Sequence, residues 1–345
     1  MKSSELEYEL PRDLIAQEPV SERTGSRLMV IRRDTGLIEH RNFPELPGLL
    51  GAGDMLVINE TSVIPARIRF ARRPTGGSVW ALLVRRLESG VWEALLTPSR
   101  RLRPGDLLDS TRKPGAPRAE IVSRTDEGKW ILRELNGALE ELGETPLPPY
   151  IRRDAAEGPR AVDRERYQTV YARVPGSVAA PTAGLHFTAG LLAGLSRAGV
   201  EIARIVLHVG PGTFRPISVE NVEEHMMDPE QYEIAEEEAA RMAAASRAGK
   251  RFVAVGTTCV RVLETLGKGG IGAGSEARGE TAIFISPGYR FGLAGAMLTN
   301  FHMPRSTPYA LVCALAGLDL IRKAYASAIE REYRFLSYGD AMLIL

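Results

Sequence analysis

The hydrophobic pattern of this chain changes in kind near residue 150, and this change constrains the fold more than any other feature. Between residues 26 and 133 the apolar residues come in short runs, at 28–31, 55–58, 79–84, 91–96 and 119–122. Turn sequences separate them, among them Thr75-Gly76-Gly77, Ser89-Gly90 and Pro104-Gly105. Closely spaced runs of this length predict antiparallel strands, so we expect a small β-barrel or sandwich.

A stiff segment ends this region. Pro146-Leu147-Pro148-Pro149-Tyr150 favours an extended connector, and the charged stretch 152–166 is expected to lack helix. From Tyr167 onward, helical periods alternate with buried runs. The expected helices are 188–197, 236–247, 308–316 and 319–330, and the expected strands are 202–209, 252–256, 282–285 and 341–345. The alternation predicts a layered α/β structure, and the six glycines of 267–279 predict a loop.

Composition and cysteine usage narrow the class of protein. Of the 345 residues, 44% are hydrophobic and 25% charged, and no apolar run approaches the roughly 20 residues that span a bilayer. The polar, acidic segment from Met1 to Leu10 lacks the features of a secretory signal, so we expect a cytoplasmic protein without a membrane span. Cys259 and Cys313 are the only cysteines, which predicts a reduced compartment and a mechanism without metal.

Charge is unevenly distributed along the chain. The formal net charge is only +1, but the segment from Val63 to Arg118 holds twelve Lys or Arg against four Asp or Glu. A local excess of this size is typical of a face that binds a polyanion. The alternative is an ordinary solvated surface, since basic clusters are common on many domains.

Imidazoles, hydroxyls and glycines are concentrated in three short segments. His186 lies between Pro181-Thr182-Ala183-Gly184 and an expected helix, whose first amides could meet an anion. His208 precedes Gly210-Pro211-Gly212-Thr213, where glycines let the main chain approach a ligand. Thr299-Asn300-Phe301-His302 places a third imidazole beside an amide. The alternatives are a buried histidine satisfied by the backbone at 186 and a simple tight turn after 208.

Weaker signals accompany these three. Gly256-Thr257-Thr258 follows a buried strand and opens a helix, where open α/β sheets often bind ligands. His225, with Glu224 and Glu230, has the groups for acid–base chemistry, although a solvated loop explains them as well. Asp340 precedes the last apolar run and either binds a polar group or belongs to a turn. No Walker loop, nucleophile elbow or dinucleotide fingerprint is present, so these motifs alone name no reaction.

Taken together, the motifs resemble a known family, the S-adenosylmethionine:tRNA ribosyltransferase-isomerases of queuosine biosynthesis. The resemblance runs nearly end to end. It is carried by Tyr8-Glu9-Leu10-Pro11, Leu14-Ile15-Ala16-Gln17, Ser26-Arg27-Leu28, Val63-Ile64-Pro65-Ala66-Arg67, Pro98-Ser99-Arg100-Arg101-Leu102, Tyr167-Gln168-Thr169-Val170-Tyr171, Gly256-Thr257-Thr258, Thr299-Asn300-Phe301-His302-Met303-Pro304, Tyr333-Arg334-Phe335 and the two histidine motifs above.

The resemblance implies a layered, Rossmann-like α/β domain, residues 1–62 and 151–345, with an inserted antiparallel β-barrel, residues 63–150. It also implies transfer of the ribosyl part of S-adenosylmethionine to the aminomethyl-deazaguanine base at the tRNA wobble position. Adenine and methionine would leave while the sugar rearranges to the epoxide of epoxyqueuosine. S-adenosylmethionine is then a consumed substrate, no cofactor is bound permanently, and the partner is the anticodon loop of tRNA. We expect a monomer.

Site residues follow from the same resemblance. A base must withdraw a proton next to the sulfonium, and the departing adenine needs a hydrogen-bond or proton donor. These roles are open among His186, His208, His302 and Asp340. The residues expected to bind S-adenosylmethionine are Thr182, Gly184, Phe187, Gly210, Gly212, Thr213, Phe214, Thr257, Thr258 and Asn300. Those expected to contact tRNA are Arg27, Arg67, Arg100 and Arg101.

The chain departs from the family pattern at four positions. Ser62 replaces an arginine, Asp228 a histidine, Gly295 an aspartate and Trp80 a glutamate. Two alternatives therefore stay open. One is a divergent relative that transfers the same sugar to a deazapurine outside tRNA, and the other is a protein that binds RNA or a ligand without catalysis.

Overall fold

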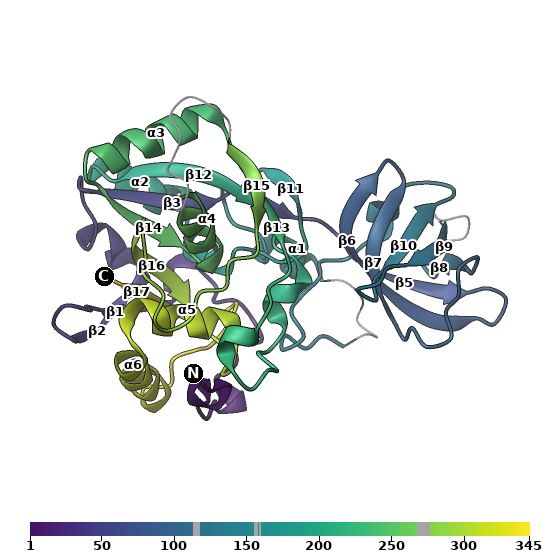
Figure 1. Ribbon diagram of the computed structural model, residues 1–345, viewed down its shortest axis with the longest axis horizontal. Coiled ribbons are helices and arrows are strands. Elements are labelled where there is room, and N and C mark those ends of the chain that lie inside the picture. Colours follow the sequence, from purple (N-terminus) through teal and green to yellow (C-terminus); the bar gives the residue numbers. More distant parts are fainter. Residues whose placement is uncertain (113–117, 155–157, 159, 268–276) are drawn as a thin grey trace.

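A computed structural model describes the chain except for residues 113–117, 155–157, 159 and 268–276 and the side chains of Thr213 and Phe214. It has a larger and a smaller lobe, each with a separate core of buried apolar side chains (Figure 1). The larger lobe holds a nine-stranded mixed sheet and the smaller one is a closed antiparallel barrel. The predicted fold class, an α/β domain carrying a β-barrel, is confirmed.

The large sheet combines strands from both halves of the sequence. Its strands are β1 (Arg27–Ile31), β2 (Ile38–Asn42), β3 (Asp54–Asn59), β12 (Glu201–Leu207), β13 (Glu230–Ile234), β14 (Arg251–Val255), β15 (Ala277–Thr281), β16 (Ala294–Asn300) and β17 (Ala341–Ile344). They lie in the order β15-β13-β12-β3-β14-β16-β17-β1-β2. Strands β12, β3, β14 and β16 are parallel, whereas β17 and β1 run the opposite way. The carboxyl ends of four strands therefore meet the amino ends of β17 and β1 at one edge.

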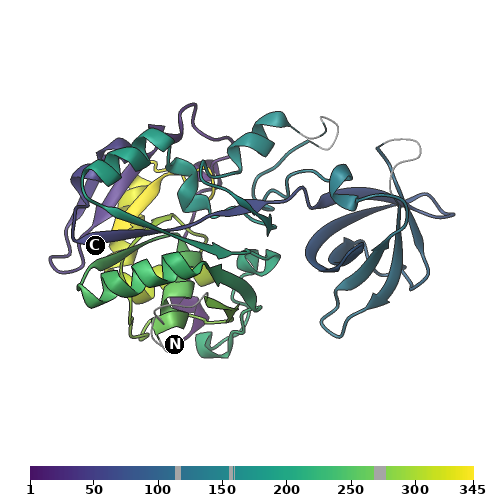
Figure 2. The same cartoon turned by 90° about the horizontal axis from the view of Figure 1, so that it is seen from above.

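Helices cover both faces of this sheet. On one face α2 (Ala189–Arg197) and the 3-10 helix η4 (Phe43–Gly48) pack on Leu28, Leu56 and Leu298. On the other, α3 (Glu236–Arg247), α4 (Thr257–Gly267), α5 (Thr307–Ala316) and α6 (Leu318–Glu330) pack on Met29, Val57 and Met297. Figure 2 shows α2 and α3 on opposite sides of the sheet. Because strand side chains alternate, each position on a strand belongs to one of these two faces.

Shorter elements complete the larger lobe. Strands β4 (Thr61–Val63) and β11 (Val174–Ser177) form a separate parallel pair. A short helix, α1, covers Ala161–Arg166. The remaining 3-10 helices of this lobe are η1 (Ser3–Leu6), η2 (Arg12–Leu14), η3 (Arg23–Gly25), η6 (Thr182–His186), η7 (Pro211–Phe214) and η8 (Val222–Glu224), whereas η5 (Leu139–Leu142) packs on the core of the smaller lobe.

The barrel is a single insertion whose strands all pair antiparallel. They are β5 (Arg67–Arg72), β6 (Gly77–Glu88), β7 (Val91–Thr97), β8 (Leu107–Ser110), β9 (Arg118–Arg124) and β10 (Trp130–Glu134), in the closed order β10-β7-β6-β5-β8-β9. Alternate residues such as Val79, Ala81 and Leu83 point inward and are buried. In Figure 2 the chain after β3 runs from the larger lobe directly into the barrel.

Most expected elements are confirmed. The helices expected at 188–197, 236–247, 308–316 and 319–330 are α2, α3, α5 and α6, and the strands expected at 202–209, 252–256 and 341–345 are β12, β14 and β17. In the barrel, the runs at 79–84, 91–96 and 119–122 lie in β6, β7 and β9.

Four expectations need correction. The runs 28–31 and 55–58 belong to the large sheet rather than to the barrel, and β3 is a parallel strand buried along its whole length. Part of the stretch 152–166 forms α1, where Asp163 accepts two hydrogen bonds from Arg153. No strand covers 282–285, because the pairing ends with β15 at Thr281. Of the expected loop 267–279, residues 277–279 belong to β15 and 268–276 lie outside the described residues.

Two negative findings apply to the described part of the chain. None of its helices is both long and apolar enough to cross a bilayer. No cluster of three or more His, Cys, Asp or Glu side chains in the same part is arranged to hold a metal ion.

Candidate active site

The predicted catalytic residues lie near one edge of the large sheet, but they form separate clusters there. This edge carries the carboxyl ends of β3, β12, β14 and β16 and the amino ends of β17 and β1. His208 follows β12, Asn300 ends β16, and Asp340 precedes β17. The sheet order separates the His208 position from the Asn300 and Asp340 positions by β3 and β14.

The first cluster is centred on His186, at the end of η6. Its Nδ1 lies 2.8 Å from Ser26 Oγ and its Nε2 lies 3.0 Å from Asn300 Nδ2. The Thr182 hydroxyl donates to Asn300 Oδ1 at 2.9 Å, so the amide nitrogen of Asn300 is the donor to His186. It follows that Nε2 accepts, that Nδ1 carries the proton and that the ring is neutral.

His186 is sealed from solvent. Its exposed fraction is 4%, and its ring lies 5.0 Å from the ring of Phe43. Burial, together with two nearby arginines, lowers the pKa of His186 to about 3. The environment is that of a buried histidine with both ring nitrogens satisfied, by side chains rather than by the backbone.

Asp340 and Arg27 form an ion pair next to this cluster. Asp340 is 2% exposed, and its Oδ1 accepts from the backbone N–H of Arg27 at 2.8 Å. Arg27 Nε donates to Asp340 Oδ2 at 3.1 Å and another guanidinium nitrogen donates to the Arg331 carbonyl at 2.8 Å. The Arg27 guanidinium also lies 4.1 Å from the ring centre of Tyr333. Much of the hydrogen-bonding capacity of Arg27 is thus used within the chain.

Gly184 and Phe187 lie in the core under the same edge. Phe187 has no exposed surface, and its ring contacts Phe43 edge-on at 5.3 Å. A Cβ at Gly184 would overlap the Tyr171 hydroxyl and the Thr169 methyl group. Glycine at 184 therefore permits the close packing of η6, and Phe187 offers no free face for stacking.

His302 lies on the opposite face of the sheet from His186. Thr299 precedes Asn300 on β16, so the two side chains point to opposite faces. His302 Nε2 is 2.8 Å from Thr299 Oγ1, and its backbone N–H donates to the Tyr325 hydroxyl at 3.0 Å. Burial lowers the pKa of His302 to about 3. The structure does not bring this imidazole together with the other two.

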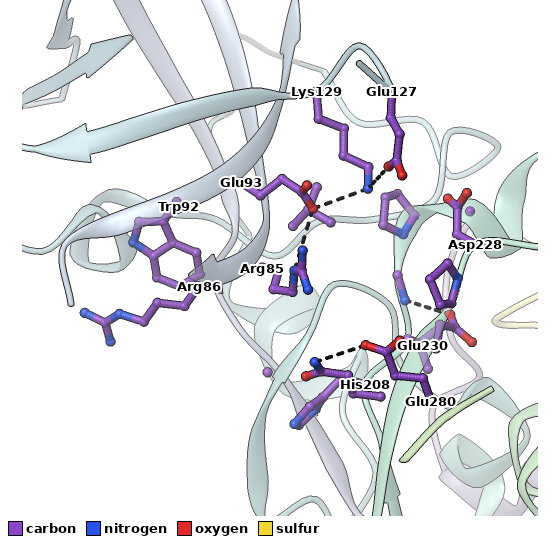
Figure 3. A pocket seen from close by; sticks show the side chains of 18 of the residues that line it. Arg85, Arg86, Trp92, Glu93, Glu127, Lys129, His208, Asp228, Glu230 and Glu280 are labelled. Atoms are coloured by element: carbon purple, nitrogen blue, oxygen red, sulfur yellow. Dashed lines mark hydrogen bonds and ion pairs between the residues drawn. The ribbon is translucent and has the colours of Figure 1, made fainter. Parts of the chain in front are cut away.

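His208 is the third predicted imidazole, and it faces a cleft between the two lobes (Figure 3). Its Nδ1 is 2.9 Å from Thr61 Oγ1, and the Thr61 hydroxyl donates to Ser177 Oγ at 2.9 Å. Because the Thr61 proton is used in that bond, Thr61 Oγ1 accepts the proton of Nδ1. The other nitrogen, Nε2, is then an unprotonated acceptor without a protein partner among the described residues.

The local backbone fits closely around this ring. Gly176 has φ +151°, and a Cβ there would lie 2.6 Å from His208 Cε1. Ser177 Oγ accepts the backbone N–H of Val209 at 2.8 Å, which ties β11 to the end of β12. Burial lowers the pKa of His208 below its usual 6.5, while Glu233 opposes the shift. The imidazole is therefore oriented by its neighbours and is neutral near pH 7.

The cleft has a volume of about 660 Å³, in the range of small-molecule sites. Its cations are Arg85, Arg86 and Lys129, and its carboxylates are Glu93, Asp126, Glu127, Glu140, Asp228, Glu230 and Glu280. Figure 3 shows Lys129 between Glu93 and Glu127 on the barrel side, with His208 and Glu230 opposite. Arg215 and Arg261 pair with Asp228 and Glu230 from outside this lining. Carboxylates remain in excess even when both are counted.

Gly210 and Gly212 line the same cleft. The Gly210 N–H donates to Glu230 Oε1 at 2.9 Å, and Glu230 forms a buried ion pair with Arg261. A Cβ at Gly212 would lie 2.7 Å from Asp228 Oδ2. Glycine at 212 thus permits the close approach of Asp228, and the N–H of Gly210 is already used by Glu230. The side chains of Thr213 and Phe214, also predicted to bind the substrate, lie outside the described residues.

Thr257 and Thr258 lie between the two histidine clusters, at the start of α4. Gly256, with φ +86°, makes the turn from β14 into this helix. Both threonines line a small recess that shares Met227 with the cleft. Thr258 is 6% exposed and its hydroxyl has no protein partner among the described residues.

The arginines predicted to contact tRNA are not in the cleft. Arg67 is on β5, where its guanidinium lies 4.3 Å from the ring centre of Trp80. Arg100 and Arg101 are exposed in the turn after β7. The arginines of the barrel that do line the cleft are Arg85 and Arg86, which the sequence marked only as part of the basic excess of residues 63–118.

Sequence reasoning also missed Thr61, Ser177 and Gly176, the residues around His208. Thr61 and Ser177 are 116 positions apart and meet only through the pairing of β4 with β11. A strand of three or four residues leaves little periodic signal. The string Asn59-Glu60-Thr61-Ser62 offered the one hint, because the resembled family has a motif at this place from which the chain departs at Ser62.

The four departures from the family pattern occupy different places. Asp228 lines the cleft, and Trp80 is on the barrel. Ser62 accepts a hydrogen bond from Gln168 Nε2 at 3.3 Å. Gly295 lies at the amino end of β16, at the edge opposite the site, where a Cβ would lie 2.7 Å from Arg251 Cγ. The change at 295 therefore lies away from both histidine clusters.

Comparisons with known proteins agree over the whole length. A family model described as "Queuosine biosynthesis protein" matches residues 3–344. An S-adenosylmethionine:tRNA ribosyltransferase-isomerase of Symbiobacterium thermophilum is 50% identical over 350 residues, covering 100% of both chains. Its counterpart in Rubrobacter xylanophilus is 49% identical over 347 residues, covering 100% of this chain and 98% of its own. A crystal structure of S-adenosylmethionine tRNA ribosyltransferase from Thermotoga maritima is similar, with a TM-score of 0.56 and 37% sequence identity. The match covers 99% of this chain and 100% of that one.

Proposed function

Because the chain belongs to the queuosine biosynthesis family, together with S-adenosylmethionine:tRNA ribosyltransferase-isomerases, we propose that it makes epoxyqueuosine in tRNA. In this reaction the ribosyl part of S-adenosylmethionine is transferred to the 7-aminomethyl-7-deazaguanine base and isomerised. The bonds from the sugar to adenine and to the methionine sulfur break, a bond to the aminomethyl nitrogen forms, and adenine and methionine leave. S-adenosylmethionine is a substrate of this enzyme, which is a transferase and an isomerase.

The observation that carries the proposal is the cleft that His208 lines, with Nδ1 of this histidine held by Thr61. Near neutral pH S-adenosylmethionine carries a sulfonium and an ammonium against one carboxylate, so it is a net cation. A cleft with excess carboxylates attracts such a molecule, and its low-dielectric walls strengthen the attraction. The phosphates of tRNA would be repelled by the same groups. We therefore assign the donor to the cleft and the tRNA backbone to arginines outside it.

His208 is the proposed base. Removal of a proton next to the sulfonium needs an unprotonated group that faces the substrate. Nε2 of His208 is unprotonated, because Nδ1 holds the proton against Thr61 and because burial lowers the pKa of the ring, and His208 lines the cleft assigned to the donor. His186 and His302 are neutral as well, but both ring nitrogens of His186 have protein partners, and His302 does not line the cleft.

In this proposal the side chains around His186 hold one another in place and do not react with the substrate. The bond from Thr182 fixes the Asn300 amide, and that amide fixes the His186 ring. Thr257 and Thr258 lie between this cluster and the cleft, at the start of α4, where hydroxyl and amide donors suit the carboxylate of the methionine part. We propose these two threonines as donor-binding residues.

The proposal is tested by following adenine release from labelled S-adenosylmethionine. With tRNA bearing the aminomethyl base, we expect release that depends on this RNA and an epoxyqueuosine product in the nucleoside digest. Release with a free aminomethyl-deazapurine instead would identify a relative with a different acceptor. Binding of the donor without any release would identify a non-catalytic protein, and either result would refute the proposed reaction.

A further inference from the structure

All three tryptophans of the chain lie in the barrel, and each has an arginine near its ring. The distances from guanidinium carbon to ring centre are 4.3 Å for Arg67 and Trp80, 5.3 Å for Arg86 and Trp92, and 5.3 Å for Arg124 and Trp130. Trp92 and Trp130 are buried, at 2% and 3% exposed, because they fill the barrel. Trp80 alternates with the inward residues of β6, so it points outward and is partly exposed.

Basic side chains surround Trp80. Arg69 is its direct neighbour on β5, with the guanidinium carbon 5.9 Å from the ring centre. Thr97 is its neighbour on β7, and the exposed turn of Arg100 and Arg101 follows three residues later. We call this surface the Trp80 face and define it as Trp80, Arg67, Arg69, Arg100, Arg101 and Arg112.

The cations of this face are poorly balanced. Within the part of the chain that the structure describes, Glu144 is the carboxylate that pairs with them, at 3.7 Å from Arg67 and 3.3 Å from Arg112. Five arginines thus share one acidic partner. The side chains of Arg67 and Arg112 are 44% and 36% exposed, so their guanidinium groups can reach a second anion.

We propose that the Trp80 face binds a single-stranded segment of the RNA substrate, with an unpaired base stacked on Trp80 and phosphates held by the arginines. An aromatic ring among cations is the combination that proteins use for unpaired nucleotides, because every base has a π face and every linkage a charge. Guanidinium planes add further stacking surfaces. The identity of the RNA as tRNA rests on the proposed function, but the binding mode does not.

The position of the face agrees with such a role. Val84 lines the cleft and lies on the same strand as Trp80, four residues away, which is about 13 Å along β6. RNA on this face would therefore bring nucleotides close to the cleft. A protein partner would need apolar area around Trp80, whereas the neighbours there are charged.

The first experiment measures binding of an unmodified anticodon stem-loop RNA to the full-length protein at fixed salt. We expect Trp80→Leu to weaken binding about fivefold to hundredfold, the range for loss of one stacked base. Trp80→Phe keeps an aromatic face and should stay within about threefold of wild type. Quenching of tryptophan fluorescence by the RNA should be much weaker in Trp80→Phe, because Trp92 and Trp130 are only 2% and 3% exposed.

The second experiment separates charge from stacking. The Arg67→Ala, Arg69→Ala double variant should lower the slope of log Kd against log salt by about 0.7 for each phosphate that is no longer neutralised. Arg124→Ala is the matched control. It also removes an arginine that lies near a tryptophan of the barrel, but that tryptophan, Trp130, is buried and cannot stack with a base. It should change neither the slope nor the affinity, and thermal melts verify that each variant is folded.

Several results would overturn the inference. Unchanged affinity of Trp80→Leu, with unchanged quenching of the remaining fluorescence by the RNA, would refute stacking, even if the arginine variants bind weakly. Equal competition by an acidic peptide would identify a protein-binding surface instead. Failure of the proposed function looks different: wild type would release no adenine yet still bind the RNA through Trp80.

Discussion

His186 and His208 come from motifs of similar appearance, yet their environments differ. His186 is 4% exposed, and both of its ring nitrogens contact side chains, Ser26 and Asn300. His208 contacts Thr61 through Nδ1, has no protein partner for Nε2 among the described residues, and lines a cleft. A motif can therefore identify where imidazoles occur, whereas the packing decides which of them meets a substrate.

The substitution His208→Ala is the most direct test of this difference between the two histidines. If Nε2 withdraws the proton, adenine release should fall by about 10²- to 10⁴-fold, the usual contribution of a general base. Binding of S-adenosylmethionine, measured by calorimetry, should change much less. A variant with near-normal turnover would remove His208 from the mechanism.

The second prediction concerns stability at His186. In the folded protein its pKa is about 3, against 6.5 when unfolded, so the unfolded state binds the extra proton first. The stabilisation is full above pH 6.5 and is lost progressively as the pH falls toward 3, by about 1.4 kcal/mol per unit. His186→Gln should reduce the pH slope of the unfolding free energy measured in urea by the share of His186, while the share of His302, whose pKa is also about 3, remains. The substitution should also cost about 2 kcal/mol at pH 7.5 through weakened buried hydrogen bonds. An unchanged slope would mean that His186 titrates normally.

The third prediction concerns the pH dependence of kcat/KM, which reports on His208. The pKa of His208 is lowered by burial, and the neutral ring is the base, so kcat/KM should be level above about pH 6.5. Below the folded pKa it should fall about tenfold per pH unit. A fall that begins above pH 6.5 would contradict the lowered pKa.

The smallest expected effect is that of Thr61→Val, which keeps the shape but removes the acceptor of His208 Nδ1. Loss of one neutral hydrogen bond corresponds to about fivefold in kcat/KM. The proton of the His208 ring should also redistribute between Nδ1 and Nε2. NMR of ¹⁵N-labelled histidine detects this change of tautomer. Thr61→Ser should restore both, whereas a role of Thr61 in packing alone would change neither the tautomer nor the pH profile.

The layered α/β domain and the antiparallel barrel were predictable because their elements are long enough to show a period. The helix from Glu236 to Arg247 was expected with the bounds that the structure has. Strand β3 was misassigned because a strand buried on both faces reads as a plain apolar run. Thr61 and Ser177 were beyond reach, because their contact depends on a pairing between short, distant strands.

The position of β17 also has a consequence for how the protein is made. This strand lies between β16 and β1, so a segment translated near residue 341 fills a gap beside one translated near residue 27. On the ribosome, the barrel can complete its hydrogen bonding long before synthesis reaches that point. The large sheet stays incomplete between β16 and β1 until β17 has been made. Chaperones would therefore be most needed in the period before β17 is synthesised.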